Sequence, residues 1–298
     1  MKSLHYLRRL LRLDYVHKMA YLIPAILWQL VFMAIPIVSM ILISFWHSDP
    51  TTLTLVRTFT LENYRKFFSS QAYVTLLLKT LKMTAISVVM VVAISYPLAY
   101  CVSFKVRSRS RQLLLLVAMF LPFWTSYLVR TFAWVTILGR GGLVNTLLIS
   151  LNLIQEPISQ LLYSENTTML GIVYVWLPFG VLPIYAAIEG IDRSTIEASN
   201  DLGANDLQTF FHVTLPLSMS GVLAAVVILF IPIAGSFVEP SLLGGLGGVM
   251  IGVTLLRQYG AGFMWPFGNA MAFILLATTS VVILVFSKFV KFEKIMRF

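Results

Sequence analysis

Long apolar runs separated by short polar connections dominate the pattern of this chain. About 20 apolar residues, at a rise of about 1.5 Å each, are enough to cross the hydrocarbon of a bilayer. Because an unpaired backbone amide is very costly in hydrocarbon, each such run is predicted to be a helix. The pattern therefore predicts an all-α membrane protein with six spans. The runs free or nearly free of charge lie at 19–46, 83–104, 112–138, 167–188, 217–238 and 268–287.

The composition agrees with a surface that faces lipid rather than water. Of 298 residues, 58% are hydrophobic and 11% are charged, and the mean hydropathy is +0.86. A soluble domain carries about 25% charged residues, so too few charges remain here to solvate a globular surface of this size. The single cysteine, Cys101, lies inside an apolar run, which excludes intramolecular disulfides and cysteine-based metal sites.

The positive charges indicate how the spans are oriented. The net charge is +10, but Lys and Arg cluster beside the apolar runs rather than on one basic face, which argues against nucleic-acid binding. With the N-terminus placed inside, 14 Lys and Arg residues fall on the inner side and 6 on the outer side, four of them in the first outer loop. Inner loops are enriched in these residues, so both termini are predicted to be cytoplasmic.

The two ends of the chain are predicted to lie at the inner surface of the membrane. Leucines alternate with arginines within residues 1–18, a pattern typical of a short interfacial helix. The apolar stretch 19–46 is longer than the roughly 7–15 residues of a signal-peptide core, so we expect it to remain as the first span. The membrane domain then covers 19–290, and residues 291–298 form a cytoplasmic tail.

Two predicted outer loops, 139–166 and 239–267, contain several glycines. The second loop carries a Gly-Gly-Leu-Gly-Gly run at 244–248. No Lys-Ser/Thr pair follows this run and no strand precedes it, so we interpret it as a flexible loop rather than a phosphate-binding loop. Because glycine lets the backbone turn tightly or approach a partner closely, these loops suit a face that contacts a soluble protein.

The sequence contains no pattern typical of an enzyme. The four histidines, His5, His17, His47 and His212, lie near predicted membrane boundaries and form no His-x-x-x-His pair. A Gly-x-x-x-x-Gly-Lys-Ser/Thr loop and a Gly-x-Ser-x-Gly turn are also absent from the sequence. The chain is therefore predicted to be non-catalytic and to hold no metal or cofactor. Energy for moving a solute would come from a partner or from an ion gradient.

The inner loop 189–216 is more polar than the runs on either side of it. Its Ser194 and Glu197 have the spacing of a capping box, in which each side chain bonds the other residue's backbone N–H. A helix is predicted to follow. Gly203 is predicted to end that helix, since glycine is favoured in the left-handed conformation just beyond a helix C-terminus.

A second short helix is predicted in the same loop. Asn205 and Asp206 offer a new N-cap, and the helix is expected to run through Phe211. Leu215 and Pro216 then start the fifth span, because proline is tolerated in the first turn of a helix. From these residues alone, the loop is equally well explained as a surface connector and as a docking element.

The same loop resembles the EAA loop of ATP-binding-cassette (ABC) importer permeases. That pattern reads Glu-Ala-Ala, three residues, Gly, nine residues and Ile-x-Leu-Pro, and its spacing is kept here. Ser199 replaces the second alanine and Val213 replaces the isoleucine. The residues that the resemblance assigns to an ATPase-coupling loop are Glu197, Ala198, Ser199, Asp201, Gly203, Leu215 and Pro216.

This resemblance implies the type I ABC importer permease fold in a bacterial inner membrane. It implies a second homologous permease subunit, two cytoplasmic ATPase subunits that bind ATP and Mg²⁺, and a periplasmic solute-binding protein. The loop would form a coupling helix that docks in a groove of the ATPase and transmits closure of the ATPase dimer to the membrane helices. Glu197 is expected to cap its own helix, to contact the ATPase, or both.

Further motifs resemble the polyamine-type permeases, which import spermidine and putrescine. Related permeases import opines, other amines, iron, thiamine or amino-acid derivatives, so the resemblance implies a small solute, with a polyamine or a related amine or opine favoured. The motifs extend over most of residues 20–290. They lie at 121–130, 177–185, 230–232, 242–245 and 265–268.

Polar and aromatic residues at membrane depth are candidates for the solute path. Arg130 is the basic residue well inside a predicted span, and Glu239 is the acid best placed for a cationic solute. The alternatives are that Arg130 snorkels or pairs structurally and that Glu239 is a boundary carboxylate. Aromatic faces attract cations, although packing and interfacial belts are common fates of membrane aromatics. The aromatic candidates are Trp124, Tyr127, Trp134, Trp176 and Tyr185.

One departure from the polyamine-type pattern concerns the acid. Polyamine permeases tend to carry an acid just after the Phe-Ile-Pro segment of span five, whereas Glu239 is displaced along the chain, which leaves a related amine or an opine open as the solute.

Two other classes of protein also remain open. An ion-driven secondary transporter would require acids within several spans, which are nearly lacking here, and a membrane scaffold would not need the EAA spacing.

Overall fold

The fold is described by a computed structural model that covers residues 22–48, 54–260 and 263–289. The predicted interfacial helix at 1–18 and the tail at 291–298 lie outside the described residues. Within those ranges the structure is helical apart from one small hairpin. In that hairpin, His47 pairs with Val56 and Ser48 pairs with Leu55 in antiparallel register.

Short π-helical segments adjoin several of the long helices. The strands are β1 His47–Ser48 and β2 Leu55–Val56. The α-helices are α2 Ile35–Ser44, α3 Glu62–Ser69, α4 Gln71–Tyr100, α5 Arg109–Phe120, α6 Tyr127–Leu138, α7 Leu143–Ser150, α8 Glu165–Glu189, α9 Arg193–Asp201, α10 Asp206–Thr209, α11 Leu215–Ala234, α12 Val238–Leu243, α13 Ile251–Tyr259 and α14 Trp265–Phe289. The π-helical segments are η1 Leu30–Ala34, η2 Cys101–Lys105 and η5 Phe210–Thr214, and the 3-10 segments are η3 Leu121–Trp124 and η4 Ser159–Leu161.

Six helical stretches in the described residues are long and apolar enough to cross a membrane, which confirms the predicted all-α, six-span class. The second stretch begins well before the predicted start at 83, because two lysines on it have partners. Lys79 donates to the carbonyl of Gly247, and Lys82 lies 2.6 Å from the Glu165 carboxylate. The six stretches are Leu22–Ser44, Gln71–Lys105, Tyr127–Ser150, Glu165–Glu189, Asp206–Ala234 and Trp265–Lys288.

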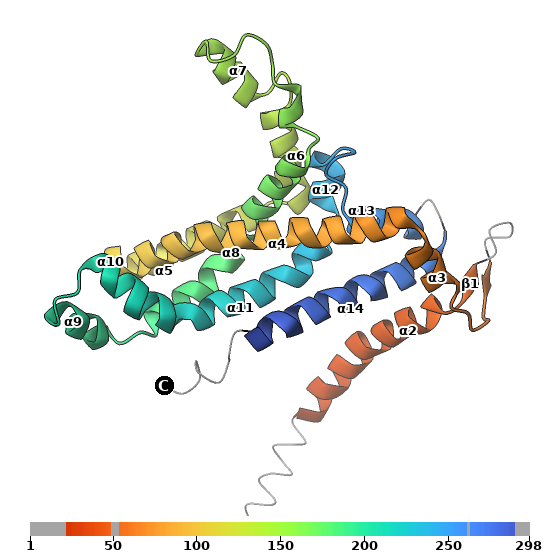
Figure 1. Ribbon diagram of the computed structural model, residues 1–298, viewed down its shortest axis with the longest axis horizontal. Helices are drawn as coiled ribbons and strands as arrows, with labels where there is room; N and C mark the ends of the chain where they lie inside the picture. The colour runs from red at the N-terminus through yellow and green to blue at the C-terminus, as the bar shows by residue number, and fades with distance from the viewer. Residues whose placement is uncertain (1–21, 49–53, 261–262, 290–298) are drawn as a thin grey trace, which may run out of the picture.

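The predicted third stretch, 112–138, is interrupted in the structure. Helix α5 ends at Phe120, a 3-10 turn follows, and α6 begins only at Tyr127. Pro122 lies in that turn, and proline both lacks an N–H and clashes with the preceding turn of a helix. Thr125 is extended, which changes the direction of the chain. Figure 1 shows α6 leaving the bundle at this break and α7 at the tip of the resulting arm.

The core lies between α4, α8 and α11, which pack against one another along their lengths (Figure 1). Val91, Ile184 and Leu229 are fully buried there. Glycine brings two of these helices close together: a Cβ on Gly180 of α8 would lie 2.5 Å from the Ser95 hydroxyl on α4. Small residues at helix contacts are typical of membrane bundles, where packing rather than hydrophobicity drives association.

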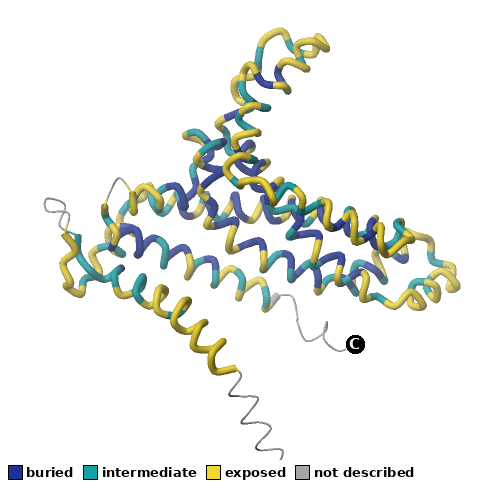
Figure 2. Tube along the Cα trace, turned by 180° about the vertical axis from the view of Figure 1, so that it is seen from behind, coloured by how far each residue is buried: buried dark blue, intermediate teal, exposed yellow. Residues whose placement is uncertain are grey.

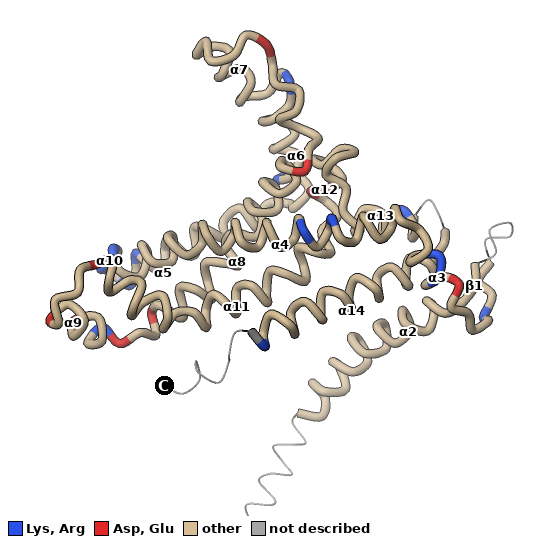
Figure 3. Tube along the Cα trace, in the orientation of Figure 1, with Lys and Arg blue, Asp and Glu red and all other residues tan. Residues whose placement is uncertain are grey.

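The outer faces of the bundle are apolar and exposed. Figure 2 shows the helical stretch that contains α2 exposed along most of its length and partly buried toward its C-terminal end, and Figure 3 shows that α11 is free of charged residues, as is α14 up to its last turn. Such faces are suited to contact with the hydrocarbon core of a bilayer. Helices α9 and α10 lie at one end of the bundle, and β1 and α3 lie at the other (Figure 1).

The glycine run at 244–248 is a closely packed turn, which differs from the flexible loop that we expected. Gly245 has a φ of +53°, and a Cβ there would lie 2.7 Å from that of Tyr163. A Cβ on Gly248 would lie 2.3 Å from the Thr168 hydroxyl. The absence of side chains thus lets this turn lie directly against the start of α8, where it joins α12 to the rest of the bundle.

Candidate functional site

A buried carboxylate marks the first part of the candidate site. Glu239, on α12, has 0% of its surface exposed. Tyr127 and Arg130 are close enough to interact with it electrostatically, and the Tyr127 hydroxyl lies within reach of the carboxylate, although outside the distance and angle limits of a well-formed hydrogen bond. Both carboxylate oxygens therefore have no hydrogen-bond partner among the described residues. A buried, unpaired carboxylate is costly, so such a group calls for a functional explanation.

Arg130 is held beside Glu239 by aromatic rings rather than by an ion pair. Its guanidinium carbon lies 4.2 Å from the ring centroid of Phe123 and 5.9 Å from that of Tyr127. Arg130 Nε is buried without a hydrogen-bond partner in the described residues, and no ion pair joins Arg130 to Glu239 there. An acid and a guanidinium group thus lie in one region while each keeps unused hydrogen-bonding capacity.

The rings of Phe123, Phe179 and Trp176 extend this region along α8. The Phe123 and Phe179 centroids are 5.2 Å apart, and those of Phe179 and Trp176 are 5.4 Å apart. The Trp176 Nε1 is also buried and unpartnered in the described residues. The structure therefore brings together four of the predicted path residues, Tyr127, Arg130, Trp176 and Glu239. We name this group, with its two phenylalanines, the buried acid cluster.

Sequence reasoning did not single out Phe123 or Phe179 as separate candidates. Both follow a proline in a Leu-Pro-Phe sequence, at 121–123 and at 177–179. That repeated tripeptide is the signal that could have found them. Their role in the cluster is to place two ring faces between Arg130 and Trp176.

The other three predicted path residues lie elsewhere, and their contact with solute stays a prediction. Trp124 is 84% exposed in η3. Trp134 packs against Tyr174, with ring centroids 5.5 Å apart. Tyr185 is buried nearer the far end of α8, where its hydroxyl accepts a hydrogen bond from Arg109 at 2.7 Å. The structure thus places Tyr185 beside the inner loop rather than in the buried acid cluster.

That inner end of α8 is joined to the start of α5. Arg109 Nη1 lies 2.8 Å from Glu189 Oε1, and Gln112 accepts a hydrogen bond from the Tyr185 hydroxyl at 3.1 Å. Gln112 also donates to the carbonyl of Val106. These polar contacts tie the segment that connects α4 and α5 to the helix that leads into the predicted coupling loop.

The predicted cap of α9 is wrong by two positions. The helix begins at Arg193, and the N-cap is Asp192, whose carboxylate accepts a hydrogen bond from the Ser194 N–H at 3.0 Å. The predicted capping box of Ser194 with Glu197 therefore does not form, since aspartate two residues earlier already satisfies that N–H. The same bond holds the pKa of Asp192 below its usual value.

Gly203 ends α9 as predicted, with a left-handed φ of +84°. Asn205 caps the next helix in a complete capping box with Gln208. The predicted separate helix through Phe211 is instead continuous with the fifth span, because η5 joins α10 directly to α11, which begins at Leu215 with Pro216 in its first turn.

The other predicted coupling residues lie at or near the surface of α9. Glu197, Ala198 and Asp201 are exposed. Ser199 is partly buried, and its hydroxyl lies 3.0 Å from the Thr209 hydroxyl on α10. The serine that replaces the second alanine of the EAA pattern therefore joins the two helices of the loop.

The site has no arrangement typical of a metal centre. Over residues 22–48, 54–260 and 263–289, no three His, Cys, Asp or Glu side chains come together as a metal site would require. The chemistry available to the buried acid cluster is therefore that of charge, hydrogen bonding and ring faces.

Comparison with known proteins places these features in one family. The family described as a binding-protein-dependent transport system inner membrane component matches residues 24–292. The spermidine/putrescine transport system permease protein PotB of Haemophilus influenzae is 35% identical over 259 residues, covering 87% of this chain and 89% of that protein. PotB of Escherichia coli is 32% identical over the same length, covering 87% and 92%.

Solved structures show the same fold at lower identity. A chain of a bacterial ABC transporter involved in importing the acidic polysaccharide alginate matches with a TM-score of 0.68 at 19% identity, covering 94% of this chain and 96% of that one. A chain of the methionine ABC transporter MetNI in an inward-facing conformation matches with a TM-score of 0.54 at 17% identity, covering 76% and 100%. The predicted importer permease fold is confirmed.

Proposed function

Because the chain belongs to the family of binding-protein-dependent transport system inner membrane components and is a multi-pass permease of that family, we propose that its solute is a polyamine or a closely related amine. The PotB proteins, named for spermidine and putrescine transport, support this choice at 32–35% identity. The alginate transporter shares only the fold, so its anionic solute does not bear on this one.

The observation that carries the proposal is the unpaired carboxylate of Glu239. A protonated amine is a compact cation that an acid and aromatic faces attract, and both lie in the buried acid cluster. Arg130 stands beside the acid without pairing with it. As an ammonium group arrives, it would take the place of Arg130 as the positive charge that acts on Glu239.

The permease is further proposed to work with a second permease subunit, two cytoplasmic ATPase subunits and a solute-binding protein. ATP and Mg²⁺ would bind the ATPase subunits, and this chain would carry out no covalent chemistry. Leu202, Leu207 and Phe211 support this assignment, since all three are exposed apolar residues of the inner loop and offer a face to a partner. Both termini would lie in the cytoplasm with that loop.

Uptake of radiolabelled spermidine by the complete transporter in proteoliposomes tests the role of Glu239. Glu239→Gln should lower uptake at least about tenfold, because it removes an interaction between opposite charges worth about 1.5–3 kcal/mol. Glu239→Asp should retain part of the activity. The exposed Glu156 provides the control, since Glu156→Gln removes an acid from the outer arm and should leave uptake unchanged.

Stability separates a solute-binding role from a structural one. Glu239→Gln replaces an unpaired buried carboxyl group by an amide of similar size, so the thermal midpoint of the purified protein should stay the same or rise. A fall in both stability and uptake would mean that Glu239 is needed for folding instead. Competition with unlabelled putrescine, an opine, thiamine and ferric ion identifies the solute, and competition by one of the last two alone would contradict the amine assignment.

A further inference from the structure

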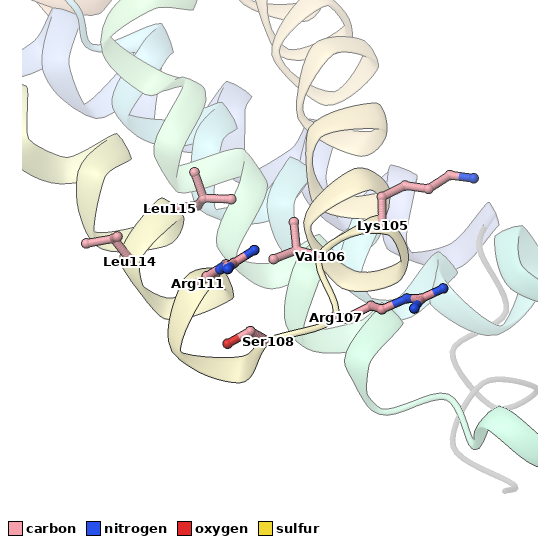
Figure 4. A pocket seen from close by; sticks show the side chains of 7 residues that line it. All are labelled: Lys105, Val106, Arg107, Ser108, Arg111, Leu114 and Leu115. Carbon is pink, nitrogen blue, oxygen red and sulfur yellow. The ribbon is translucent and has the colours of Figure 1, made fainter.

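A cavity of about 620 Å³ opens where η2 ends and α5 begins, at the same end of the bundle as the inner loop. Figure 4 shows Lys105 and Arg107 extending to one side of Val106, and Arg111, Leu114 and Leu115 on its other side. The cavity therefore has cationic side chains on both sides of Val106, which we call the cationic wall, and an apolar wall formed by Leu114 and Leu115. The lining residues are Lys105, Val106, Arg107, Ser108, Arg111, Leu114 and Leu115.

The cationic wall carries charge that the described part of the chain does not neutralise. None of Lys105, Arg107 and Arg111 forms an ion pair with a described acidic residue. The neighbouring Arg109 does have such a partner, Glu189, but it does not line the cavity. Three like charges on one short segment repel each other, so an anion in the cavity would lower their electrostatic energy.

The apolar wall continues along the outside of the bundle. Leu114 is 67% exposed, and its neighbours Leu113, Leu115 and Val117 on α5 are exposed as well. Helix α5 packs on α8 through its other side. A charged end followed by exposed apolar residues complements a phospholipid, which has a charged headgroup and apolar chains. A free anion would gain nothing from contact with the leucines.

We propose that this cavity binds the headgroup of an anionic phospholipid. The phosphate would lie among Lys105, Arg107 and Arg111, and an acyl chain would follow Leu114 and Leu115 along α5. The proposal rests on the proposed function only in placing this end of the bundle at the cytoplasmic leaflet. Basic pockets at that surface are suited to anionic headgroups, because each nearby Lys or Arg adds to the electrostatic attraction.

The cavity also adjoins the contacts that hold the inner loop. The backbone carbonyl of Ser103, just before the cavity in the chain, accepts a hydrogen bond from Arg193 at the start of α9. Arg109, within the same segment, contacts Glu189 at the end of α8. A bound headgroup would therefore order the segment to which both ends of the α8–α9 connection are attached. Lipid occupancy at this position would stabilise the resting position of the coupling loop.

Lipid binding by the purified full-length chain in detergent tests the proposal without requiring transport. Binding of fluorescent phosphatidylglycerol would be compared with that of phosphatidylcholine for wild type and for Arg107→Gln/Arg111→Gln. The double variant should bind phosphatidylglycerol at least about tenfold more weakly, because two cationic contacts to the headgroup are lost. The control is Arg65→Gln/Arg140→Gln, which removes two exposed arginines elsewhere and should bind like wild type.

A second variant separates a lipid from a free anion. Leu114→Ser/Leu115→Ser should weaken phosphatidylglycerol binding while the three cations remain, and inorganic phosphate at equal concentration should not compete. Equal competition by inorganic phosphate would overturn the lipid assignment in favour of a free anion. Unchanged lipid binding in the arginine variant would overturn the site. Loss of ATPase association in that variant, with lipid binding intact, would show that the cavity is a protein contact instead.

Discussion

At the residue scale, Glu239 reaches its buried position because a side chain is missing on another helix. Gly171 on α8 lies directly below it: a Cβ at that position would be 3.4 Å from Glu239 Cγ and 2.5 Å from Leu243 Cδ1. Helix α12 can therefore fold back onto α8 and place its acid beside α6. The burial of the unpaired carboxylate therefore depends on the absence of a side chain at Gly171.

Gly171→Ala should consequently displace α12. Overfilling a packed contact costs about 1–3 kcal/mol, so the variant should unfold at a lower temperature than wild type, and spermidine uptake should fall as Glu239 moves. Thermal unfolding in detergent measures the first effect. Gly141→Ala is the matched control, since a Cβ there meets nothing within 4 Å. Equal stability of the two variants would show that α12 does not pack on α8 in this way.

The cap of α9 gives a second prediction at this scale. Asp192→Ala removes the acceptor of the Ser194 N–H, so the amides of the first turn of α9 should exchange hydrogen faster, whereas Asp192→Asn keeps an acceptor and should behave like wild type. Because the pKa of Asp192 is lowered in the folded protein, its ionised carboxylate adds to the stability of the folded state at pH values above the unfolded-state pKa. That contribution is lost as the pH falls through the folded-state pKa.

Hydrogen exchange measured by mass spectrometry across acid pH, corrected for the intrinsic exchange rates, follows that loss. Protection of the first turn should decline with acid in the wild type and stay level in Asp192→Asn, whose cap does not titrate. A parallel decline in both proteins would contradict the assignment of the cap to the Asp192 carboxylate.

At the element scale, the inner loop contains two helices joined by residues 202–205, of which Gly203 has a left-handed backbone. Ser199 and Thr209 hold the helices together through their hydroxyl groups, and Gly203 makes the turn between them. The angle of α9 against α10 thus depends on a conformation that other residues adopt only at a cost of about 1–2 kcal/mol.

Gly203→Ala should therefore weaken coupling without preventing assembly. The measurement is ATP hydrolysis by the reconstituted complex, with and without the loaded binding protein, and stimulation should fall several-fold. Gly190→Ala provides the control, because Gly190 begins the same inner loop, has a φ of −75° and would place its Cβ only in ordinary contact, 3.5 Å from its nearest neighbours. Full stimulation in Gly203→Ala would mean that the loop is only a surface connector.

At the scale of the whole molecule, two highly exposed leucines mark separate parts of the surface. The inner loop carries Leu202, which is 89% exposed, and the glycine turn carries Leu246, which is 98% exposed. If the termini and the inner loop are cytoplasmic, these two leucines lie on opposite sides of the membrane. In Figure 1 the inner loop lies at one end of the bundle, while the loop after α12 lies away from that end.

Cysteine labelling tests this orientation. In a Cys101→Ser background, Leu246→Cys should react with a membrane-impermeant maleimide on right-side-out vesicles, and Leu202→Cys should react only on inverted vesicles. Each variant acts as the control for the other, since both positions are highly exposed. The opposite labelling pattern would place both termini outside and would contradict the orientation inferred from Lys and Arg.

The sequence predicts the spans well because lipid imposes a simple requirement, an apolar run long enough to cross. It predicts boundaries less well where a local contact decides them: Lys79 and Lys82 stay within a helix because Gly247 and Glu165 bind them. The burial of Glu239 could not be predicted, because it depends on how α12 meets α8 at Gly171, far away in sequence. The EAA spacing located the inner loop, but the choice of Asp192 over Ser194 as its cap was decided by backbone geometry.

The unbroken course from α10 through η5 into α11 has a mechanical consequence. Residues Asp206–Ala234 form one helical rod of 29 residues, about 43 Å long at 1.5 Å per residue. One end of this rod is the inner loop, and the other is followed within a few residues by α12 and Glu239. A tilt of about 5° at the loop would displace the far end by ~4 Å. If the inner loop docks on an ATPase as proposed, a small tilt there would therefore produce, over the length of this rod, a displacement near Glu239 comparable to the size of an ammonium group.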